Sequence, residues 1–286
     1  MKLKHYMLFL LFFISKFILA QTLINTGEIG SFTSARSFSI SSAGIIYVSD
    51  ISNNEIIKID TLGKILKFIG GYGWSPTLFD SPEDVFATTL NVYVSDKNNN
   101  RIQFFDKDLN FISEFSTQNS TDDRIVFRYP ICSSVSNQGD LFILDSDNKR
   151  ILKFNLRGEY QASIGGFDSG TFALNNPLQF VLTSNTKLLV ADSPNLVLFD
   201  QVGNGIKKFQ LPFQPDNINN SYQTICVFNS KQVALFNDAN LETGNINPVV
   251  LNPNIDEDIV DACVFNSKLY VLEKNTIIVY KIVTTK

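Results

Sequence analysis

Histidine is nearly absent from this sequence: the single histidine among 286 residues is His5. Beyond that position no imidazole is available, which excludes Ser-His-Asp and Cys-His nucleophilic sites and His-ligated zinc centres. Cysteine is also scarce, because Cys132, Cys226 and Cys263 are too few for a disulfide scaffold. Each lies in an apolar or small-residue stretch, so we expect buried free thiols, with one bridge between Cys226 and Cys263 as the alternative.

Basic residues are outnumbered, with 24 Lys and Arg against 28 Asp and Glu. Lys2, Lys4 and Lys16 lie in the first 20 residues, which contain no acid, so the remainder carries 24 − 3 = 21 basic residues and a net charge of 21 − 28 = −7. Nucleic-acid binding draws most of its affinity from Lys and Arg side chains that meet phosphates. An acidic chain without a basic run is therefore not expected to bind nucleic acid.

The amino terminus has the layout of a secretory signal peptide. Two lysines precede the apolar stretch Tyr6–Ile14, and Ala20 offers a small residue at the cut site. A membrane-spanning helix needs about 20 uninterrupted apolar residues, and Lys16 interrupts this run too early. We expect residues 1–20 to be removed and residues 21–286 to form a single exported domain, secreted or periplasmic. An uncleaved amino-terminal anchor is the alternative.

A short motif recurs along the rest of the chain: an apolar, β-prone run that ends in an acid. The clear copies are Tyr47-Val48-Ser49-Asp50, Tyr93-Val94-Ser95-Asp96, Phe142-Ile143-Leu144-Asp145 and Leu189-Val190-Ala191-Asp192, and weaker copies end at Asn237 and Glu273. The four clear acids are 46, 49 and 47 residues apart. A period of about 40 to 50 residues with strand-type units indicates a propeller or a similar array.

Each unit contains four short strands, as the second copy shows at Ser81–Ala87, Asn91–Asp96, Arg101–Asp106 and Asn110–Phe115. A single four-stranded meander cannot bury both of its faces, so it needs neighbours on either side. Six units of about 45 residues come to about 270, which fits the 286 − 20 = 266 residues available. We therefore predict an all-β, six-bladed β-propeller of four-stranded antiparallel blades.

Two units depart from the scheme. The last offers only three strands before the chain ends, so we predict that Thr22–Ile29 supplies its outer strand and closes the ring. A frayed amino-terminal tail is the alternative. The fifth unit is degenerate after Asn237, and its two remaining strands are placed at Leu241–Ile246 and Pro248–Asn252.

In the second unit, Tyr93-Val94-Ser95-Asp96 is followed by Lys97-Asn98-Asn99-Asn100-Arg101-Ile102-Gln103-Phe104-Phe105, and Phe79-x-x-Pro82 and Phe127-x-x-Pro130 lead into the first strands of the second and third units. This run resembles the NHL repeat, and the Phe-x-x-Pro segments match the start of the inner strand in that family. The resemblance implies a six-bladed propeller and is specific for fold, not for activity. WD40 and kelch arrays are disfavoured, since there is a single tryptophan, Trp74, and Gly165-Gly166 lacks the further spaced features of a kelch blade.

The resemblance does not extend to every propeller enzyme. Propellers of the amidating-lyase and paraoxonase types rely on histidines, which are missing here. A calcium site of the kind used by gluconolactonase-like propellers needs none, and it stays open. The inner strands offer Asp84, Gln179 and Asp261 for it, and the acidic loop Asn254–Asp258 is either a second oxygen-rich candidate or a solvated charge run.

Propeller topology places the turn after each second strand on the same face as the connections into the inner strands, and function most often lies on such loops. The most conspicuous connection is Gly70–Pro76, where Tyr72 and Trp74 are binding anchors unless Trp74 packs as a lid over the next blade. Arg101 and Arg150 complete the ligand-binding candidates, and pairing with a repeated acid is their alternative role.

The repeated acids Asp50, Asp96, Asp145 and Asp192 precede polar turns, so we expect their carboxylates to accept hydrogen bonds from free turn amides. A ring of cation ligands is the alternative. The favoured function is an exported, monomeric, non-enzymatic propeller that binds a protein, peptide or glycan on its loop-bearing face and needs no cofactor or transmembrane anchor. A calcium-dependent hydrolase or lactonase is the alternative, and RNA binding ranks last.

Overall fold

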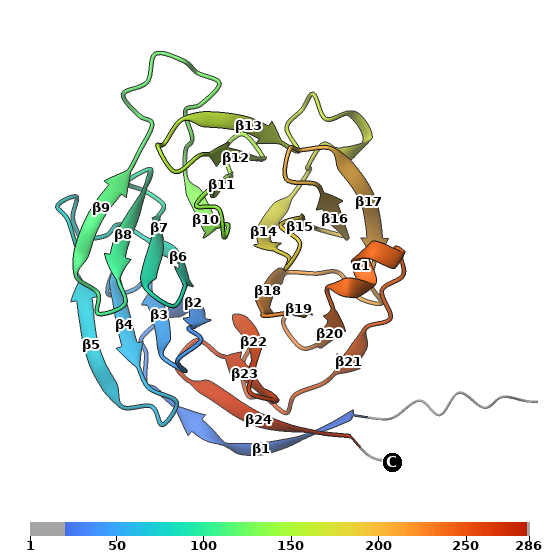
Figure 1. The fold of residues 1–286 in the computed structure, drawn as a ribbon. Coiled ribbons are helices and arrows are strands. Elements are labelled where there is room, and N and C mark those ends of the chain that lie inside the picture. Colours follow the sequence, from blue (N-terminus) through green and yellow to red (C-terminus); the bar gives the residue numbers. More distant parts are fainter. Residues whose placement is uncertain (1–20, 285–286) are drawn as a thin grey trace, which may run out of the picture.

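Six small sheets surround a central axis in the computed structural model, which describes residues 21–284. The signal peptide predicted for residues 1–20 lies outside the described residues. Figure 1 shows the sheets as the blades of a ring, with the first strand of each next to the axis and the last at the rim. The predicted six-bladed β-propeller is therefore confirmed.

Every blade is a four-stranded antiparallel sheet, and in the first five the strands follow one another outwards in chain order. Blades 1 to 3 contain β2 (Ala35–Ile40), β3 (Ile46–Asp50), β4 (Glu55–Ile59) and β5 (Ile65–Gly70); β6 (Pro82–Ala87), β7 (Asn91–Asp96), β8 (Arg101–Asp106) and β9 (Phe111–Phe115); and β10 (Pro130–Val135), β11 (Leu141–Asp145), β12 (Arg150–Phe154) and β13 (Tyr160–Ile164). Blades 4 and 5 contain β14 (Pro177–Leu182), β15 (Leu188–Asp192), β16 (Asn195–Phe199) and β17 (Gly205–Gln210); and β18 (Asn217–Ser221), β19 (Thr224–Phe228), β20 (Val233–Asn237) and β21 (Val249–Leu251).

The sixth blade joins the two ends of the chain, as predicted. It contains β22 (Asp261–Phe265), β23 (Lys268–Leu272), β24 (Ile277–Thr284) and, as its outer strand, β1 (Gln21–Ile29). β1 pairs antiparallel with β24 along its length, so that Leu23 lies opposite Ile282 and Ile29 lies opposite Ile277. The ring is thus held shut by backbone hydrogen bonds between segments more than 240 residues apart in sequence.

The prediction for the fifth blade was wrong in register. The strand placed at Leu241–Ile246 is instead a short helix, α1 (Ala239–Thr243), which ends at the left-handed residue Gly244. β20 is the third strand of this blade and not the second, so the weak motif copy ending at Asn237 belongs to another position. The true second strand, β19, is followed by Asn229 and not by an acid, so the acid-based pattern missed it.

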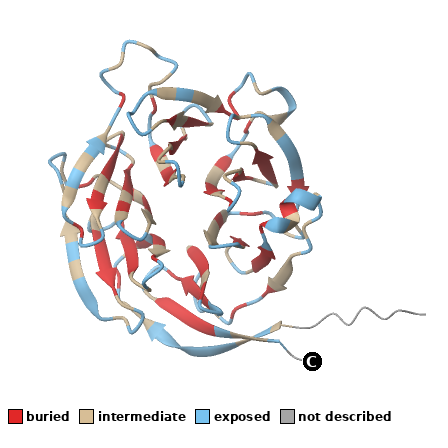
Figure 2. Cartoon of the chain, in the orientation of Figure 1, coloured by how far each residue is buried: buried red, intermediate tan, exposed pale blue. Residues whose placement is uncertain are grey.

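Burial follows from the stacking of the blades. β3, β11 and β15 are buried at every residue, because neighbouring blades cover both faces of each middle strand. The rim strands β5 and β9 contain only exposed and partly buried positions instead. Figure 2 shows the buried residues concentrated in the middle strands of the blades and an exposed rim. The core is therefore divided among the interfaces between blades.

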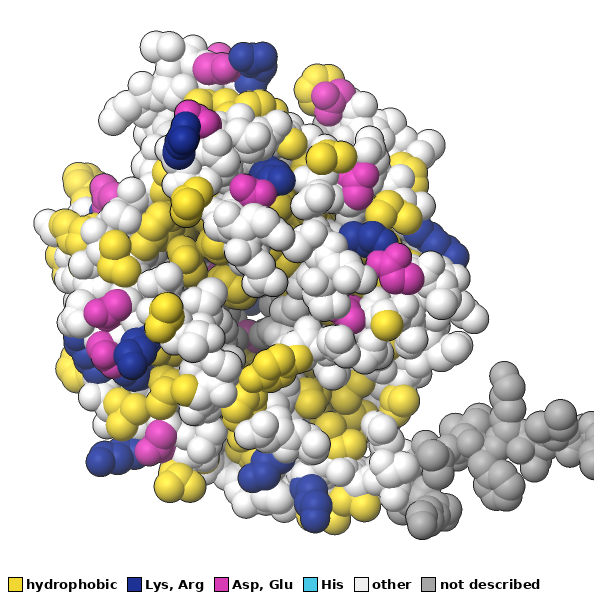
Figure 3. Space-filling model, in the orientation of Figure 1, with side chains coloured by type: hydrophobic (Ala, Val, Ile, Leu, Met, Phe, Trp, Pro, Cys, Tyr) yellow, Lys and Arg dark blue, Asp and Glu magenta, His cyan; other side chains and the backbone are white. Residues whose placement is uncertain are grey.

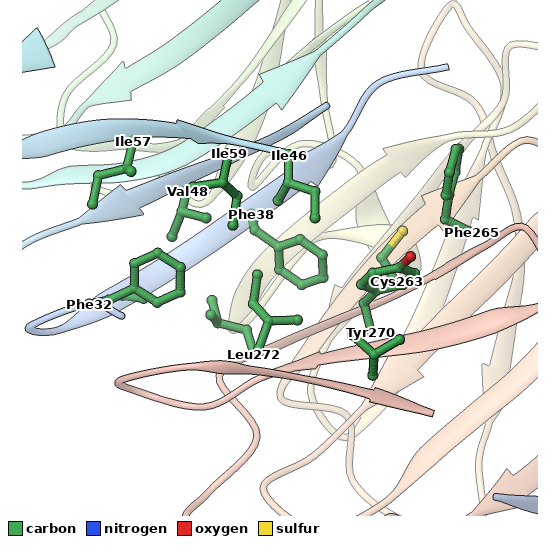
Figure 4. Close-up of a cluster of buried hydrophobic side chains, with 13 residues drawn as sticks. Phe32, Phe38, Ile46, Val48, Ile57, Ile59, Cys263, Phe265, Tyr270 and Leu272 are labelled. Carbon is green, nitrogen blue, oxygen red and sulfur yellow. The ribbon is translucent and has the colours of Figure 1, made fainter. Parts of the chain in front are cut away.

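The interface between blades 6 and 1 illustrates how such a core is built. Phe38 and Val48 from blade 1 pack in one buried cluster with Tyr270 and Leu272 from β23 (Figure 4). Full burial of an aliphatic or phenyl side chain contributes about 1.5 to 3 kcal/mol relative to an exposed one. Side chains as well as β1 therefore join the first blade to the last.

All three cysteines are buried within these interfaces and none forms a disulfide. Burial raises the pKa of the Cys226 and Cys263 thiols above their ordinary range. Their neighbours in the clusters are apolar side chains. The expectation of buried free thiols is confirmed, and each cysteine serves as a small core residue.

Candidate functional site

One face of the ring carries the connections that lead into the inner strands, and we call it the loop face. Its connections are residues 30–34, 71–81, 116–129, 165–176, 211–216 and 252–260. The turn after β3 meets them as predicted: the carbonyl of Asn54 accepts a hydrogen bond from the Gly71 N–H (2.9 Å), and its side-chain oxygen accepts one from the Ser81 N–H (2.7 Å).

The repeated acids hold these connections in place. Asp50 Oδ2 accepts a hydrogen bond from the Thr33 N–H (2.6 Å), and Asp192 Oδ1 accepts one from the Asn176 N–H (2.6 Å). In blade 6, Glu273 Oε1 accepts one from the Asp256 N–H (2.9 Å). A hydrogen bond to a charged group contributes about 1.5 to 3 kcal/mol. The acids are therefore structural, as predicted, but these amides lie in the connections into the inner strands and not in the turn that follows each acid. Asp50 also accepts a hydrogen bond from the turn amide of Ser52 (3.1 Å).

Arg101 is the most heavily bonded side chain on the loop face. Its Nε donates to Asp96 Oδ2 (2.8 Å), and its Nη1 donates to Glu114 Oε2 (2.6 Å) and to the carbonyl of Trp74 (2.6 Å). Nη2 donates to the carbonyl of Leu78 (2.9 Å). Only 5% of the residue is exposed. Arg101 therefore fixes the path of connection 71–81.

Arg150 repeats the arrangement one blade further on. Its Nε donates to Asp145 Oδ2 (2.9 Å), and its Nη2 donates to the carbonyl of Val126 in connection 116–129 (2.9 Å). The predicted arginine–carboxylate pairs are thus confirmed in both blades. Because the guanidinium groups are committed to loop backbone, they position the loops, and their direct contact with a ligand stays a prediction.

Tyr72 and Trp74 project from the loop that Arg101 holds. The loop folds back on itself, since the Gly73 N–H donates to the Phe79 carbonyl (3.0 Å) and the Phe79 N–H donates to the Gly71 carbonyl (2.9 Å). Tyr72 is nevertheless 70% exposed and Trp74 75% exposed. An indole so exposed does not act as a lid over the next blade. Both rings are held out towards solvent on an ordered backbone.

Two further exposed aromatic side chains on this face were missed. Phe167 is 96% exposed in connection 165–176, and Tyr129 is 46% exposed at the end of connection 116–129. A signal for Phe167 was present, because Ile164-Gly165-Gly166-Phe167 repeats Ile69-Gly70-Gly71-Tyr72. Three consecutive connections therefore present four exposed aromatic rings on one face.

The central channel is narrow and polar. Asp84 Oδ1 accepts hydrogen bonds from Ser37 Oγ (2.7 Å) and Gln179 Nε2 (3.3 Å), while Asp261 Oδ1 accepts one from Asn219 Nδ2 (3.1 Å). Burial raises the pKa of Asp84 to about 7 and that of Asp261 to about 6. The cavity lined by these inner strands has a volume of about 40 Å³. That is room for a few water molecules, whereas small-molecule sites take about 300 to 1,000 Å³.

The channel residues do not fit a calcium ion. Calcium needs six to eight oxygen ligands, but the oxygens of Asp84 and Asp261 already accept hydrogen bonds from the protein. Across residues 21–284, no three His, Cys, Asp or Glu side chains are grouped closely enough to hold a metal ion. In the acidic loop predicted as a second candidate, the N–H groups of Asp256 and Glu257 both donate to Glu273.

Known proteins resemble the chain in fold more than in sequence. No protein-family model matches it. The protein brain tumor of Drosophila melanogaster is 26% identical over 144 residues, which cover 49% of this chain and 13% of that protein. The chain thus matches only a small part of that relative, and the likeness supports a β-propeller family.

Among solved structures, a catalytically inactive virginiamycin B lyase from Staphylococcus aureus with quinupristin has a TM-score of 0.62 at 14% identity and covers 93% of this chain and 100% of that one. A streptogramin B lyase has a TM-score of 0.61 at 12% identity, covering 93% and 98% of the two chains. A chain of the nidogen/laminin complex has a TM-score of 0.59 at 13% identity, covering 77% and 81%. At such identities the likeness shows the fold alone. Over residues 21–284, no helix is long and apolar enough to cross a membrane.

Proposed function

We propose that this chain is an exported, non-enzymatic, NHL-like propeller that binds a protein, peptide or glycan on its loop face. The observation that carries the proposal is the group of exposed aromatic rings on connections 71–81, 116–129 and 165–176. Tyrosine and tryptophan supply large contact areas and a polar edge, and they are enriched among binding anchors. Because Arg101 and Arg150 order two of these loops in advance, binding needs little further loop ordering.

The comparisons support a binding function only at the level of fold. One structural neighbour is a chain from a complex of nidogen and laminin, and brain tumor shares sequence over about half of this chain. The lyase neighbours raise an enzymatic alternative. Residues 21–286 contain no histidine, so an imidazole acid or base is not available for it. Export rests on the layout of residues 1–20, and an amino-terminal sequence that starts at Gln21 on the secreted protein would support it.

The binding face is tested with residues 21–286 on arrays of extracellular proteins, peptides and glycans. A double variant, Tyr72→Ala with Trp74→Ala, is compared with Leu62→Ala, which removes an exposed apolar side chain from the turn between β4 and β5 on the opposite face. Loss of anchor side chains should weaken binding by about 2 kcal/mol or more, which is about 30-fold. The Leu62 variant should bind as the wild type does. Equal affinities for all three proteins would refute the loop-face proposal.

A further inference from the structure

A groove of about 740 Å³ opens between blades 2 and 3 on the face opposite the loop face. Its walls come from β7, β8 and β9 on one side, and from β10, β11, β12 and the turns 136–140 and 155–159 on the other. Figure 3 looks onto this face and shows hydrophobic side chains gathered around a hollow between the two blades. The volume lies within the range of small-molecule sites, about 300 to 1,000 Å³.

The groove walls are aromatic. The rings of Tyr93 and Phe104 meet edge to face with their centroids 5.2 Å apart, and those of Phe115 and Phe154 do so at 4.8 Å. Phe154 is buried, but the other three rings are only partly so. The cluster at this interface has six buried residues, and six further hydrophobic side chains that pack against it, these three rings among them, are only partly buried. Part of the apolar surface of this interface is therefore open to the groove.

One turn position leaves the aromatic wall uncovered, although it is not the sole cause of the opening, because Gly63 and Gly203 stand at the same position in blades 1 and 4 beside well-filled interfaces. In blade 2, Leu109 stands in the turn between the third and fourth strands at a φ of 58°, and its side chain is buried in the interface with blade 1. The corresponding residue in blade 3 is Gly158, at a φ of 76°, and it lines the groove. A Cβ at Gly158 would lie 3.1 Å from the ring of Phe115. Where blade 2 supplies a plug, blade 3 leaves the aromatic wall open.

The charge on the rim is unbalanced. Two charged side chains line the groove, and Glu114 is already bonded to Arg101. Arg157 is in no ion pair with any residue between 21 and 284. An arginine fork matches a carboxylate or a similar oxyanion with two parallel hydrogen bonds. The rim thus offers one cation to a ligand whose body is apolar.

We propose that this groove binds an amphipathic organic anion, whose aromatic or aliphatic body packs on Tyr93, Phe104 and Phe115 and whose acidic group meets Arg157. Ser113 and Asn137 add uncharged polar groups to the same walls. The site lies on the other side of the ring from Tyr72 and Trp74. It is therefore independent of the proposed loop-face function, and either can fail without the other.

Two dyes test the proposal on the folded protein. Anilinonaphthalene sulfonate is an aromatic anion, and N-phenyl-1-naphthylamine is its neutral counterpart without the sulfonate. We expect saturable fluorescence from both dyes. Arg157→Ser should weaken the anionic dye about three- to fivefold, as an exposed ion pair is worth up to about 1 kcal/mol. The same substitution should change the affinity of the neutral dye less than about twofold.

Blocking variants test the location of the site. Ser113→Phe fills the groove from β9, and Asn137→Phe fills it from the facing turn. Each should weaken both dyes by about tenfold or more, because the ring displaces the dye from its apolar contacts. Ile112→Phe is the matched control, because Ile112 is next to Ser113 on β9 and its side chain lies on the exposed side of the strand. It should leave both affinities unchanged.

The dye results are interpreted only for variants that keep the wild-type cooperative unfolding transition, because the anionic dye also binds loosely packed chains. Undiminished binding of both dyes to a folded blocking variant would overturn the groove as the site. An equal effect of Arg157→Ser on the two dyes would overturn the assignment of an anionic ligand. Two blocking variants from opposite walls keep the test decisive if one of them does not fold.

Discussion

At the scale of single residues, polar contacts between side chains and loop backbone order the loops that present the candidate binding residues. Asp96 is buried, and burial raises its pKa, whereas its hydrogen bonds to Asn99 and to Arg101 lower it. The guanidinium of Arg101 carries this contact on to the carbonyls of Trp74 and Leu78. One buried pair thus links the end of a second strand to the loop that displays an exposed indole.

Removal of Arg101 should therefore be costly. We expect Arg101→Met to lower the free energy of unfolding by about 3 to 5 kcal/mol, because it leaves the buried Asp96 carboxylate without its partner. Arg124→Met removes the cation of an exposed pair with Asp122, and it should cost less than about 1 kcal/mol. Urea unfolding of both variants measures the difference. Equal stabilities of the two would show that the Arg101–Asp96 contact is not structural.

Residue-level expectations succeeded where a role follows from a repeat. An arginine follows the acid at the same distance in units 2 and 3, as Arg101 after Asp96 and Arg150 after Asp145, so their pairing could be predicted from spacing alone. Phe167 could have been found by comparing Ile164-Gly165-Gly166-Phe167 with its counterpart at Tyr72. The groove could not, because it depends on how the turn at Gly158 meets the ring of Phe115 in another blade. No pattern within one unit contains that contact.

At the scale of secondary-structure elements, β1 contains no buried residue, so its own side chains give it little support. Five consecutive residues of its nine, Ile24 to Glu28, are exposed, and the pairing with β24 is irregular between Asn25 and Gly27. The attachment of β1 therefore depends on its backbone ladder with β24. Leu23 packs against the buried cluster between blades 5 and 6, while its neighbour Ile24 is exposed. The two faces of β1 therefore contribute unequally to ring closure.

The asymmetry of β1 gives a matched pair of variants. Leu23→Ala should lower the free energy of unfolding by about 1 to 2 kcal/mol, less than the 2 to 5 kcal/mol typical of a fully buried leucine. Ile24→Ala, on the exposed side of the same strand, should change it by no more than about 0.5 kcal/mol. Deletion of residues 21–29 should lower the free energy of unfolding by more than either substitution does. Chemical denaturation compares the three, and an unchanged melting temperature after the deletion would contradict closure by β1.

Element boundaries were predictable wherever turn residues separated the strands cleanly, as in blade 2. The prediction for the fifth blade was wrong because β18 and β19 are joined by only Tyr222 and Gln223, and no acid follows β19. α1 then occupies the connection between β20 and β21, where the pattern required strands throughout. A short helix of five residues has too little periodicity to be recognised from sequence.

At the scale of the whole molecule, two buried acids from different blades meet near the axis. Asp84 comes from blade 2 and Asp261 from blade 6, and the charge of Asp261 is one cause that raises the pKa of Asp84, after burial. Their hydrogen-bond partners come from blades 1, 4 and 5. These contacts couple five blades, and a hydrogen bond between Asp84 and the backbone of Ser133 adds blade 3, so protonation of the channel network affects the ring as a unit.

This coupling predicts how stability depends on pH. The pKa of Asp84 is about 7 in the folded chain, against about 4 for an aspartate in an unfolded chain. Between these pH values Asp84 binds more protons in the folded state than in the unfolded state. The contribution of Asp84 to stability is therefore fully present below about pH 4 and is lost as the pH rises to about 7. Asp261, whose pKa is about 6, acts in the same direction.

Asp84→Asn should flatten the fall in unfolding free energy between about pH 4 and pH 7 without abolishing it, because Asp261 remains. Asp122→Asn, at an exposed carboxylate whose pKa Arg124 lowers to about 2, should keep the wild-type slope over that range. Urea titrations at several pH values give the three slopes, and a wild-type slope in the Asp84 variant would mean that this carboxyl is ionised in the folded ring at low pH.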